Sequence, residues 1–364
     1  MARDIHRKPF DEGTKAKLAI FRDYLREWLP VFIAPNKPLW TTINIFDFFA
    51  GPGADVQGTK GTPLIILDEL AAHTQSIKAK GISVNLYFNE YKKNKCEELK
   101  ARMEGNALQQ YTIEIDTLDF NEAFDKEFPK MRDNKSANLL FLDQNGVKHI
   151  TEDVFKKIIS LKQTDFLFFS SSSYFKRFSE HPFIVQHIKL SAEEIEKTDY
   201  HKIHKLVLEF YKSLIPQNDS YYLAPFSLKK NANIYGLIFG SGHVYGIEKF
   251  LRTCWKIDPE RGEANFDIDD DNITPGQLGL FTGDVQKPQK VDLFEKELEE
   301  KILSKQLKTD KDIYLFTLSN GFLPKHARSV VNRLIKENRI EKCVPDLSHR
   351  ICKAETAQTE MRVI

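Results

Sequence analysis

A glycine-containing turn near residue 50 has the residue types of a ligand-binding turn. The segment Asp47-Phe48-Phe49-Ala50-Gly51-Pro52-Gly53 follows the predicted strand that starts at Ile43, and a predicted helix opens after it at Thr62-Pro63. Glycines let the backbone approach a ligand closely, and an aspartate accepts hydrogen bonds from an amine or a hydroxyl. The turn lacks the third glycine of a dinucleotide fingerprint and the Gly-Lys-Ser/Thr of a P-loop. We therefore expect Asp47, Gly51 and Gly53 to form a phosphate or cofactor site of another kind.

Three further acids follow predicted strands. Glu90 ends the strand at 83–88, Asp116 follows the strand at 111–115, and Asp143 closes the strand at 138–143. Open α/β sheets bind ligands at the carboxyl ends of their strands, so these acids and Asp47 are expected at one edge of the sheet. For Glu90 and Asp116 the alternative stays open that each caps a helix or closes a turn.

The turn resembles motif I of class I S-adenosylmethionine-dependent methyltransferases, in which an acid lies just before or within a Gly-x-Gly turn. This resemblance implies S-adenosylmethionine as the cofactor, held at Asp47, Gly51 and Gly53. It also implies that Glu90 binds the ribose hydroxyls and that Asp116 lies near the adenine.

A second resemblance covers about residues 40–340. The turn followed by Gly61-Thr62-Pro63-Leu64 is similar to a segment of the three-Cys-motif partner protein family (TcmP), a bacterial family. The same family has segments similar to Phe141–Gly146, Gly246–Phe250, Trp255–Pro259 and Pro324–Ala327. The resemblance implies a partner, a cysteine-motif protein that looks like a radical S-adenosylmethionine enzyme.

The end of the fourth strand departs from familiar nucleic-acid methyltransferases. In Asp143-Gln144-Asn145-Gly146, Gln144 stands where proline is usual, and the segment has no aromatic ring to stack on an extruded base and no Pro-Cys nucleophile. Asp143 remains the candidate catalytic residue, as a base or an orienting group. Two hypotheses stay open: a divergent methyltransferase that acts on or at nucleic acid, and a non-catalytic adaptor with a degenerate cofactor pocket that binds a partner enzyme.

Composition limits the possible partners. The chain has 364 residues, with 53 Lys and Arg against 52 Asp and Glu, so contact with nucleic acid requires a local basic patch. No apolar run reaches the roughly 18 residues of a membrane span, and no apolar stretch follows the basic start as in a secretory signal. Four scattered cysteines without a CxxC pair fit a reducing cytoplasm.

Strands that alternate with helices predict a doubly wound, mostly parallel Rossmann-like sheet. The first helix is expected to end before Pro30, and Thr62 is expected to be the N-cap of the next. Residues 1–257 are expected to form the sheet domain, with a helical insertion at about 171–216 over the strand ends. Residues 258–290 read as an acidic, irregular linker, and 291–364 as a winged helix of three helices and a strand pair, 339–344 with 349–353. We predict no metal site, because the acids at 267–271 lack the glycine and terminal glutamate of an EF-hand.

The predicted helix at 324–338 carries the local basic patch. Its apolar residues fall on one side of a helical wheel, and its basic and amide residues fall on the other. Such a third helix suits contact with phosphates and bases in a major groove. We therefore predict that DNA or RNA binds to Lys325, Arg328, Asn332, Lys336 and Arg339. The alternative is a solvated helix of a protein-interaction winged helix.

Overall fold

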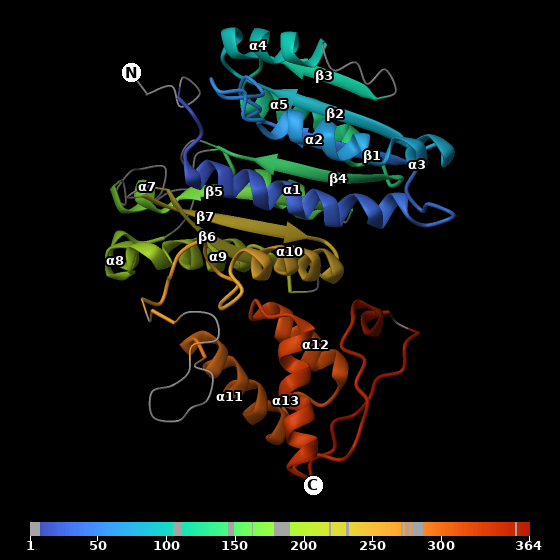
Figure 1. Cartoon of the computed structure of the whole chain (residues 1–364), viewed down its shortest axis with the longest axis vertical. Helices are drawn as coiled ribbons and strands as arrows, with labels where there is room; N and C mark the ends of the chain where they lie inside the picture. The colour runs from blue at the N-terminus through green and yellow to red at the C-terminus, as the bar shows by residue number, and fades with distance from the viewer. Residues whose placement is uncertain are drawn as a thin grey trace. The chain divides into compact units, whose positions relative to one another are not determined.

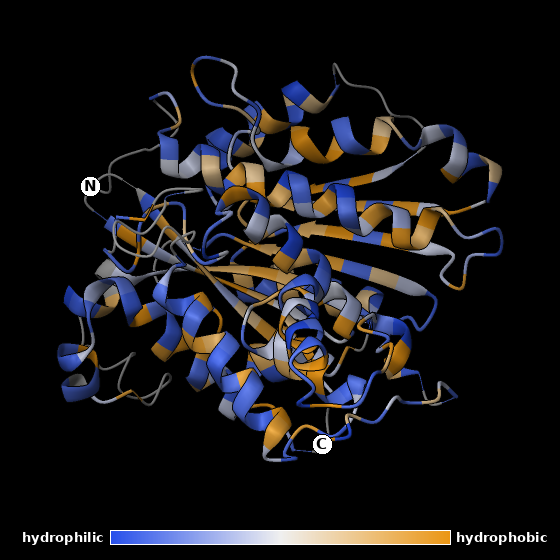
Figure 2. Ribbon diagram, turned by 60° about the horizontal axis from the view of Figure 1, so that its bottom comes forward, coloured by the Kyte–Doolittle hydropathy of each residue, from blue (hydrophilic) through white to orange (hydrophobic). Residues whose placement is uncertain are grey.

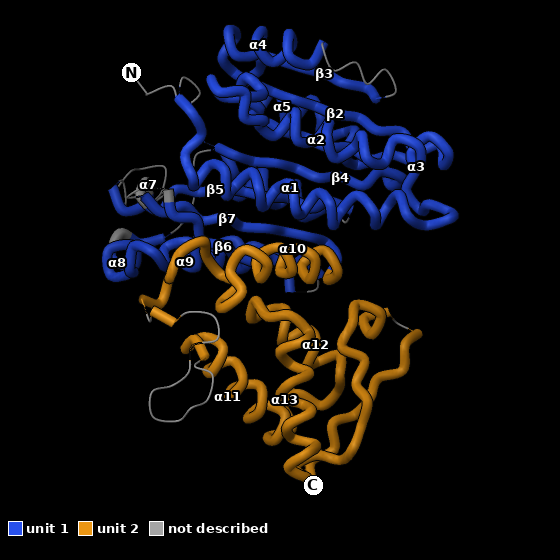
Figure 3. Tube along the Cα trace, in the orientation of Figure 1, with its two compact units in different colours: residues 1–243 blue, residues 244–364 orange. Residues whose placement is uncertain are grey.

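The computed structural model describes residues 8–104, 111–144, 149–161, 163–177, 190–217, 220–230, 233–270, 272–273, 277, 287–353 and 355–364. The chain divides into two compact units, residues 1–243 and 244–364 (Figure 3). The expected first domain ended at 257, so the difference is the helix α10 (Val244–Ile257). Among the described helices, none is both long and apolar enough to cross a membrane.

The first unit is built on one seven-stranded sheet with the order β3-β2-β1-β4-β5-β7-β6 (Figure 1). β1 pairs in parallel with β2 and β4, β2 with β3, and β4 with β5, whereas β7 is antiparallel to both β5 and β6. This is the doubly wound order with one antiparallel strand inserted before the last. The strands are β1 (Thr42–Asp47), β2 (Ser83–Asn89), β3 (Thr112–Asp116), β4 (Ser136–Leu142), β5 (Thr164–Ser171), β6 (Tyr222–Lys230) and β7 (Asn233–Ser241).

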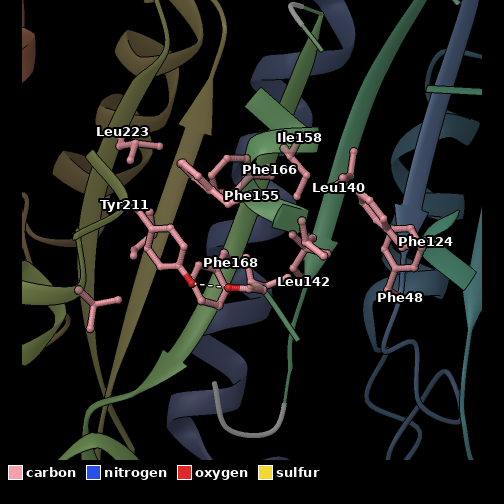
Figure 4. Close-up of a cluster of buried hydrophobic side chains, with 14 of the residues drawn as sticks. Phe48, Phe124, Leu140, Leu142, Phe155, Ile158, Phe166, Phe168, Tyr211 and Leu223 are labelled. Carbon is pink, nitrogen blue, oxygen red and sulfur yellow. Dashed lines mark hydrogen bonds between the residues drawn. The ribbon is translucent and has the colours of Figure 1, made fainter. Parts of the chain in front are cut away.

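Helices cover both faces of this sheet. They are α1 (Glu12–Ile33), α2 (Thr62–Ala71), α3 (Thr74–Ala79), α4 (Lys93–Glu104), α5 (Phe120–Met131), α6 (Glu152–Ile159), α7 (Ser172–Arg177), α8 (Ala192–Lys197) and α9 (Ile203–Ser213), with a 3-10 turn η3 (Tyr200–Lys202). On one face α1 packs through Phe21 on Phe141 and through Tyr24 on Phe239, with ring centroids 4.7 Å apart in each pair. On the other face, aromatic and aliphatic side chains of the strands meet those of α5, α6 and α9 (Figure 4). Figure 2 shows the hydrophobic residues gathered along the strands.

The local predictions fail where long-range packing decides the outcome. α1 continues through Pro30 to Ile33, because Phe32 and Ile33 are buried and the carbonyl of Pro30 still accepts the Ala34 amide at 2.9 Å. The N-cap of α2 is Gly61, one residue before the expected Thr62.

The helical segment between β5 and β6 lies differently from the prediction. We expected it over the strand ends, but α9 packs on β6 and β7, on the face of the sheet. The cause is the apolar side of α9, whose Val207, Leu208 and Tyr211 join the core below this face. Part of the expected insertion, residues 178–189, lies outside the described residues.

The second unit contains α10, α11 (Gln289–Leu303), α12 (Asp310–Ser319), α13 (Pro324–Lys336) and a 3-10 turn η4 (His349–Cys352). Within it, Glu248 of α10 accepts a hydrogen bond from the Tyr314 hydroxyl of α12 at 2.7 Å. The indole N–H of Trp255 donates to the Gly321 carbonyl at 2.9 Å. These bonds explain why α10 groups with the C-terminal helices.

The expected strand pair of the wing is wrong. Ile340 forms a bridge with Val363, and residues 349–352 form η4 instead of a strand. The extended segment after α13 therefore pairs with residues near 363. These residues lie outside the range 339–353 from which the hairpin was predicted.

The start of the predicted acidic linker is ordered around a buried arginine. Arg261 is 4% exposed, and its guanidinium lies 3.1 Å from Asp267 and 3.4 Å from Asp269. The carboxylate of Asp258 accepts the backbone amides of Arg261 and Glu263. The prediction of a solvated linker is therefore wrong for residues 258–264, where Asp258, Arg261 and Glu263 are all buried.

Arg261→Met is expected to destabilise the second unit by about 2 kcal/mol, because it leaves Asp267 and Asp269 without their cation; both are partly exposed, so solvent screens part of the cost. Lys296→Met is the control. Lys296 pairs with Asp292 on the surface, and its loss is expected to cost less than about 0.5 kcal/mol. Urea unfolding of both variants measures the difference, and equal midpoints would show that the arginine does not organise this segment.

Candidate functional site

The turn after β1 is shaped by two glycines. Gly51 and Gly53 have φ of +62° and +84°, a region that residues with a side chain rarely adopt. The chain then doubles back, so that the amide of Gly61 donates to the Gly53 carbonyl at 2.8 Å. A Cβ on Gly53 would lie 2.9 Å from Leu99 of α4. A side chain at position 53 would therefore require the end of Leu99 to shift, and it would also oppose the positive φ of this residue.

Asp47, at the end of β1, carries an unsatisfied oxygen. Its side chain is 1% exposed; Oδ1 accepts the Phe49 amide at 3.0 Å, whereas Oδ2 is buried without a hydrogen-bond partner in the described structure. Burial, with smaller contributions from the charges of Asp143 and Glu90, raises the pKa of Asp47 to about 8, against the lowering effects of the Phe49 amide and Lys17. Buried polar atoms are nearly always hydrogen-bonded. An orphaned, protonatable carboxyl beside a glycine turn is therefore typical of a ligand site.

Glu90 lies next to this turn and holds its backbone. Its Oε2 accepts the Gly51 amide at 3.1 Å, and its Oε1 accepts the Lys92 amide at 2.8 Å. The two bonds tie the ends of β1 and β2 together. The position agrees with the sequence-based placement of Glu90 at this edge, and the bonds add a role in ordering the glycine turn. Its contact with a ribose stays a prediction.

Asp116 is engaged in the packing of β3. Its Oδ2 accepts the Tyr87 hydroxyl at 2.9 Å and the Lys126 ammonium at 2.6 Å. The hydrogen bonds that Lys126 donates to Asp116 and to Glu114 raise its pKa. The contacts favour the structural alternative for Asp116 in the unliganded protein, and its predicted proximity to an adenine stays a prediction.

Asn89 is a site-forming residue that the sequence analysis missed. It is 2% exposed at the end of β2; its Oδ1 accepts the Leu118 amide and its Nδ2 donates to the Leu118 carbonyl, both at 3.0 Å. This two-sided clamp fixes the loop after β3 beside the glycine turn. An amide residue directly before Glu90 was the available signal.

Asp143 closes β4 at the same edge and pairs with Lys17 of α1. The Lys17 ammonium also lies 5.3 Å from the ring centroid of Phe169 in β5. Lys17 was missed, and nothing in its surrounding sequence indicates a partner 126 positions away. The structure thus gives the predicted catalytic residue a charged neighbour.

Gln144 follows Asp143 and is also buried, at 5% exposure. Its Oε1 accepts the His149 amide at 2.9 Å, whereas its Nε2 has no hydrogen-bond partner in the described part of the chain. Residues 145–148, which include Asn145 and Gly146 of the predicted motif, lie outside the described residues. The side chain that replaces the usual proline therefore offers an unused donor.

A cluster of three rings lies beside these polar groups. The rings of Phe49 and Phe120 are stacked with centroids 5.5 Å apart, and the His149 ring lies 5.3 Å from each of them. All three side chains are at the carboxyl edge, after β1, β3 and β4. Phe120 is buried, whereas Phe49 and His149 are partly exposed. The edge thus contains the glycine turn, a buried carboxyl, an ion pair and two partly exposed rings.

The second unit contains a helix-turn-helix. α12 and α13 are joined by a turn in which Gly321 has φ of +77°, and Pro324 opens α13. The apolar face of α13 is buried through Ala327, Val330, Val331 and Leu334. All five residues predicted to contact nucleic acid are exposed: Lys325, Arg328, Asn332, Lys336 and Arg339.

Two arginines of this region already form ion pairs within the protein. Glu299 of α11 lies 2.8 Å from Arg333 and also pairs with Arg339. Lys325, Arg328, Asn332 and Lys336 recur at helical spacing, so they form one exposed face of α13. We call these four residues the α13 face. Arg339 lies at its end with its charge partly neutralised.

Comparisons with known proteins agree with the division of the chain into two units. Residues 267–346 match the family model described as "GMT-like wHTH domain". Among curated proteins, none matches the sequence significantly.

Solved structures similar to the chain include methyltransferases. They are Trm1 from Pyrococcus horikoshii with S-adenosylmethionine (10% identity, 66% of this chain and 58% of that chain, TM-score 0.35), an rRNA methylase from Streptococcus thermophilus (11%, 61% and 93%, 0.31), and TYW2 from M. jannaschii with AdoMet (13%, 65% and 78%, 0.31). The chain thus spans less than two thirds of the Trm1 structure. The sheet order and the family-model match lead to the conclusion that the chain joins a doubly wound, Rossmann-like sheet to a C-terminal winged helix-turn-helix domain.

Proposed function

We propose that this protein binds S-adenosylmethionine at the carboxyl edge of its sheet and transfers the methyl group to a nucleic acid. The observation that carries the proposal is the orphaned Oδ2 of Asp47, buried beside the turn of Gly51 and Gly53. A ligand hydroxyl or ammonium would supply the missing hydrogen bond. S-adenosylmethionine carries both groups.

Different residues at this edge would bind the cofactor and the substrate. Asp47 and the Gly51–Gly53 turn would hold the cofactor, with Glu90 fixing the turn through the Gly51 amide. When bound, S-adenosylmethionine supplies an electrophilic methyl group. Asp143 would orient the substrate nucleophile or accept its proton, and the Nε2 of Gln144, which has no partner among the described residues, would donate to an acceptor atom of the substrate.

The nucleic-acid part of the proposal is supported by the second unit. The family-model match covers the helix-turn-helix, and the α13 face exposes three basic side chains and one amide side chain to solvent. In such domains the second helix of the motif enters the major groove and basic side chains contact phosphates. We propose that the α13 face recruits the DNA or RNA substrate.

The resemblance to the three-Cys-motif partner family adds a partner to the proposal: a cysteine-motif protein of a bacterial system. A second function, a non-catalytic adaptor for such a partner, is favoured by specific contacts. Glu90 already accepts two backbone amides and Asp116 already accepts Tyr87 and Lys126, so neither carboxylate needs a ligand to satisfy its hydrogen bonding.

Calorimetry with S-adenosylmethionine separates the two functions. A methyltransferase is expected to bind the cofactor with micromolar affinity, and label from its methyl group is expected to enter total RNA or genomic DNA from an unmethylated source. Incorporation into only one of them identifies the substrate class. Absence of heat and of thermal stabilisation at millimolar cofactor would contradict the methyltransferase and leave the adaptor.

A further inference from the structure

The helix α1, which is not part of the sheet, places the charged side chain of Lys17 at the candidate site. α1 begins after Asp11, which caps it by accepting the Thr14 amide at 2.9 Å. Just before it, the Phe10 amide donates to Oδ2 of the buried Asp55 at 2.7 Å. Asp55 lies in the loop between β1 and α2, so the start of α1 is fastened to the glycine-turn loop. One turn and a half later, Lys17 reaches the end of β4.

Lys17 is held in a defined place at this edge. Its side chain is 16% exposed and that of Asp143 is 29% exposed, so their ion pair is shielded from much of the solvent. The ring of Phe169 lies next to the ammonium. The charges of Lys17 and Asp143 both act on Asp47, in opposite directions. Lys17 therefore neutralises the carboxylate that the proposed function assigns to catalysis and lies within electrostatic range of the carboxyl assigned to the cofactor.

We propose that Lys17 is an internal cation that competes with the positive charge of the cofactor for Asp143. The inference rests on the proposed function, and it concerns the selection of ligand charge at that site. S-adenosylmethionine carries a sulfonium charge, whereas its product S-adenosylhomocysteine does not. A sulfonium bound near Asp143 would be repelled by the Lys17 ammonium, whereas the uncharged thioether of the product would not. The site is thereby biased toward the neutral product form, and Lys17 must leave Asp143 for the charged cofactor to bind tightly.

The test compares the affinities of the two ligands in matched variants. Lys17→Met keeps most of the side-chain length and removes the charge. It is expected to raise the ratio of S-adenosylmethionine affinity to S-adenosylhomocysteine affinity by about tenfold at low salt. Lys17→Arg keeps the charge and should leave the ratio near that of the wild type. Lys15→Met is the matched control, because Lys15 lies on the same helix, is half exposed and pairs with Glu12 at 2.9 Å.

Isothermal titration calorimetry on the full chain gives both affinities, and thermal unfolding confirms that the variants fold. An unchanged ratio in Lys17→Met, with both ligands bound, overturns the competition while leaving the proposed function intact. Equal weakening of both ligands also overturns it, because Lys17 would then bind the carboxylate that the two ligands share. If neither the wild type nor Lys17→Met binds either ligand, the proposed function fails and this inference fails with it.

Discussion

Asp47→Asn is expected to abolish detectable binding of S-adenosylmethionine and, at the same time, to stabilise the unliganded protein above pH 7. The amide keeps the size of the side chain and can still accept the Phe49 amide through Oδ1. It replaces Oδ2, which could accept a hydrogen bond from a ligand ammonium or hydroxyl, with an amide NH2 that can only donate. A residue that binds a ligand often lowers the stability of the protein, so its replacement removes binding and raises stability at the same time.

The pH dependence of the stability follows from the pKa of Asp47, which is about 8 in the folded protein against an ordinary 3.8. The folded state therefore binds more protons than the unfolded state between these values. The contribution of Asp47 to stability is fully present below about pH 4, is lost as the pH rises, and stays lost above about pH 8. Asparagine does not titrate. The stability of the variant relative to the wild type should thus rise by about 4 kcal/mol between pH 5 and pH 8, or about 1.4 kcal/mol for each pH unit.

Urea unfolding at pH 5 and pH 8, with calorimetric titration of the cofactor, measures both effects. Asp165→Asn is the matched control. Asp165 is partly buried, but it lies near the amino end of β5, where its Oδ2 accepts the Tyr24 hydroxyl at 2.6 Å. Its replacement should leave cofactor affinity unchanged. Wild-type affinity in Asp47→Asn would remove Asp47 from the site.

Replacing Lys325, Arg328 and Lys336 together with alanine is expected to weaken nucleic-acid binding by about 100-fold at low salt. The salt slope should fall by about 2.7, or about 0.9 for each phosphate that the variant no longer neutralises. Arg339 is left in place because Glu299 already pairs with it. The three side chains are exposed and lie outside the buried face of α13, so stability should change by less than about 0.5 kcal/mol.

Fluorescence anisotropy with duplex DNA and with RNA at two salt concentrations measures the affinity and its slope. A triple alanine variant of Lys305, Lys308 and Lys353 removes the same charge from exposed positions outside α13 and serves as the control. If the two variants lose affinity equally, net charge rather than the α13 face binds the nucleic acid. A wild type that binds neither duplex DNA nor RNA in low salt would favour the adaptor function.

The sequence by itself determined the features that depend on neighbours along the chain. The alternation of apolar runs with helical patterns predicted the start of β1 and the bounds of β2, β3 and β4 within one or two residues, because burial on both faces makes such strands continuously apolar. The glycine turn after Asp47 was predicted from residue types that only a close backbone approach requires. The amphipathic pattern of α13 predicted which of its residues are buried, since a helix repeats every 3.6 residues.

Strand β6 shows why a local signal can mislead. It was missed, and it contains Pro225, which cannot donate a hydrogen bond within a sheet. In the structure β6 is the last strand of the sheet and pairs only with β7 among the described strands. A proline is tolerated at such an edge, and the position of a strand in the sheet order is a property of the tertiary structure.

Only the tertiary structure decided which charges meet. Lys17 and Asp143 are 126 positions apart, Arg261 is buried among acids that local composition assigned to solvent, and Asp116 is bonded to Lys126 instead of facing the edge alone. The sequence placed Asp47, Glu90 and Asp143 at one edge because parallel strands end together. It could not give their hydrogen-bond partners, because periodicity reports the burial of a residue, whereas the identity of its neighbours depends on how the whole chain is connected.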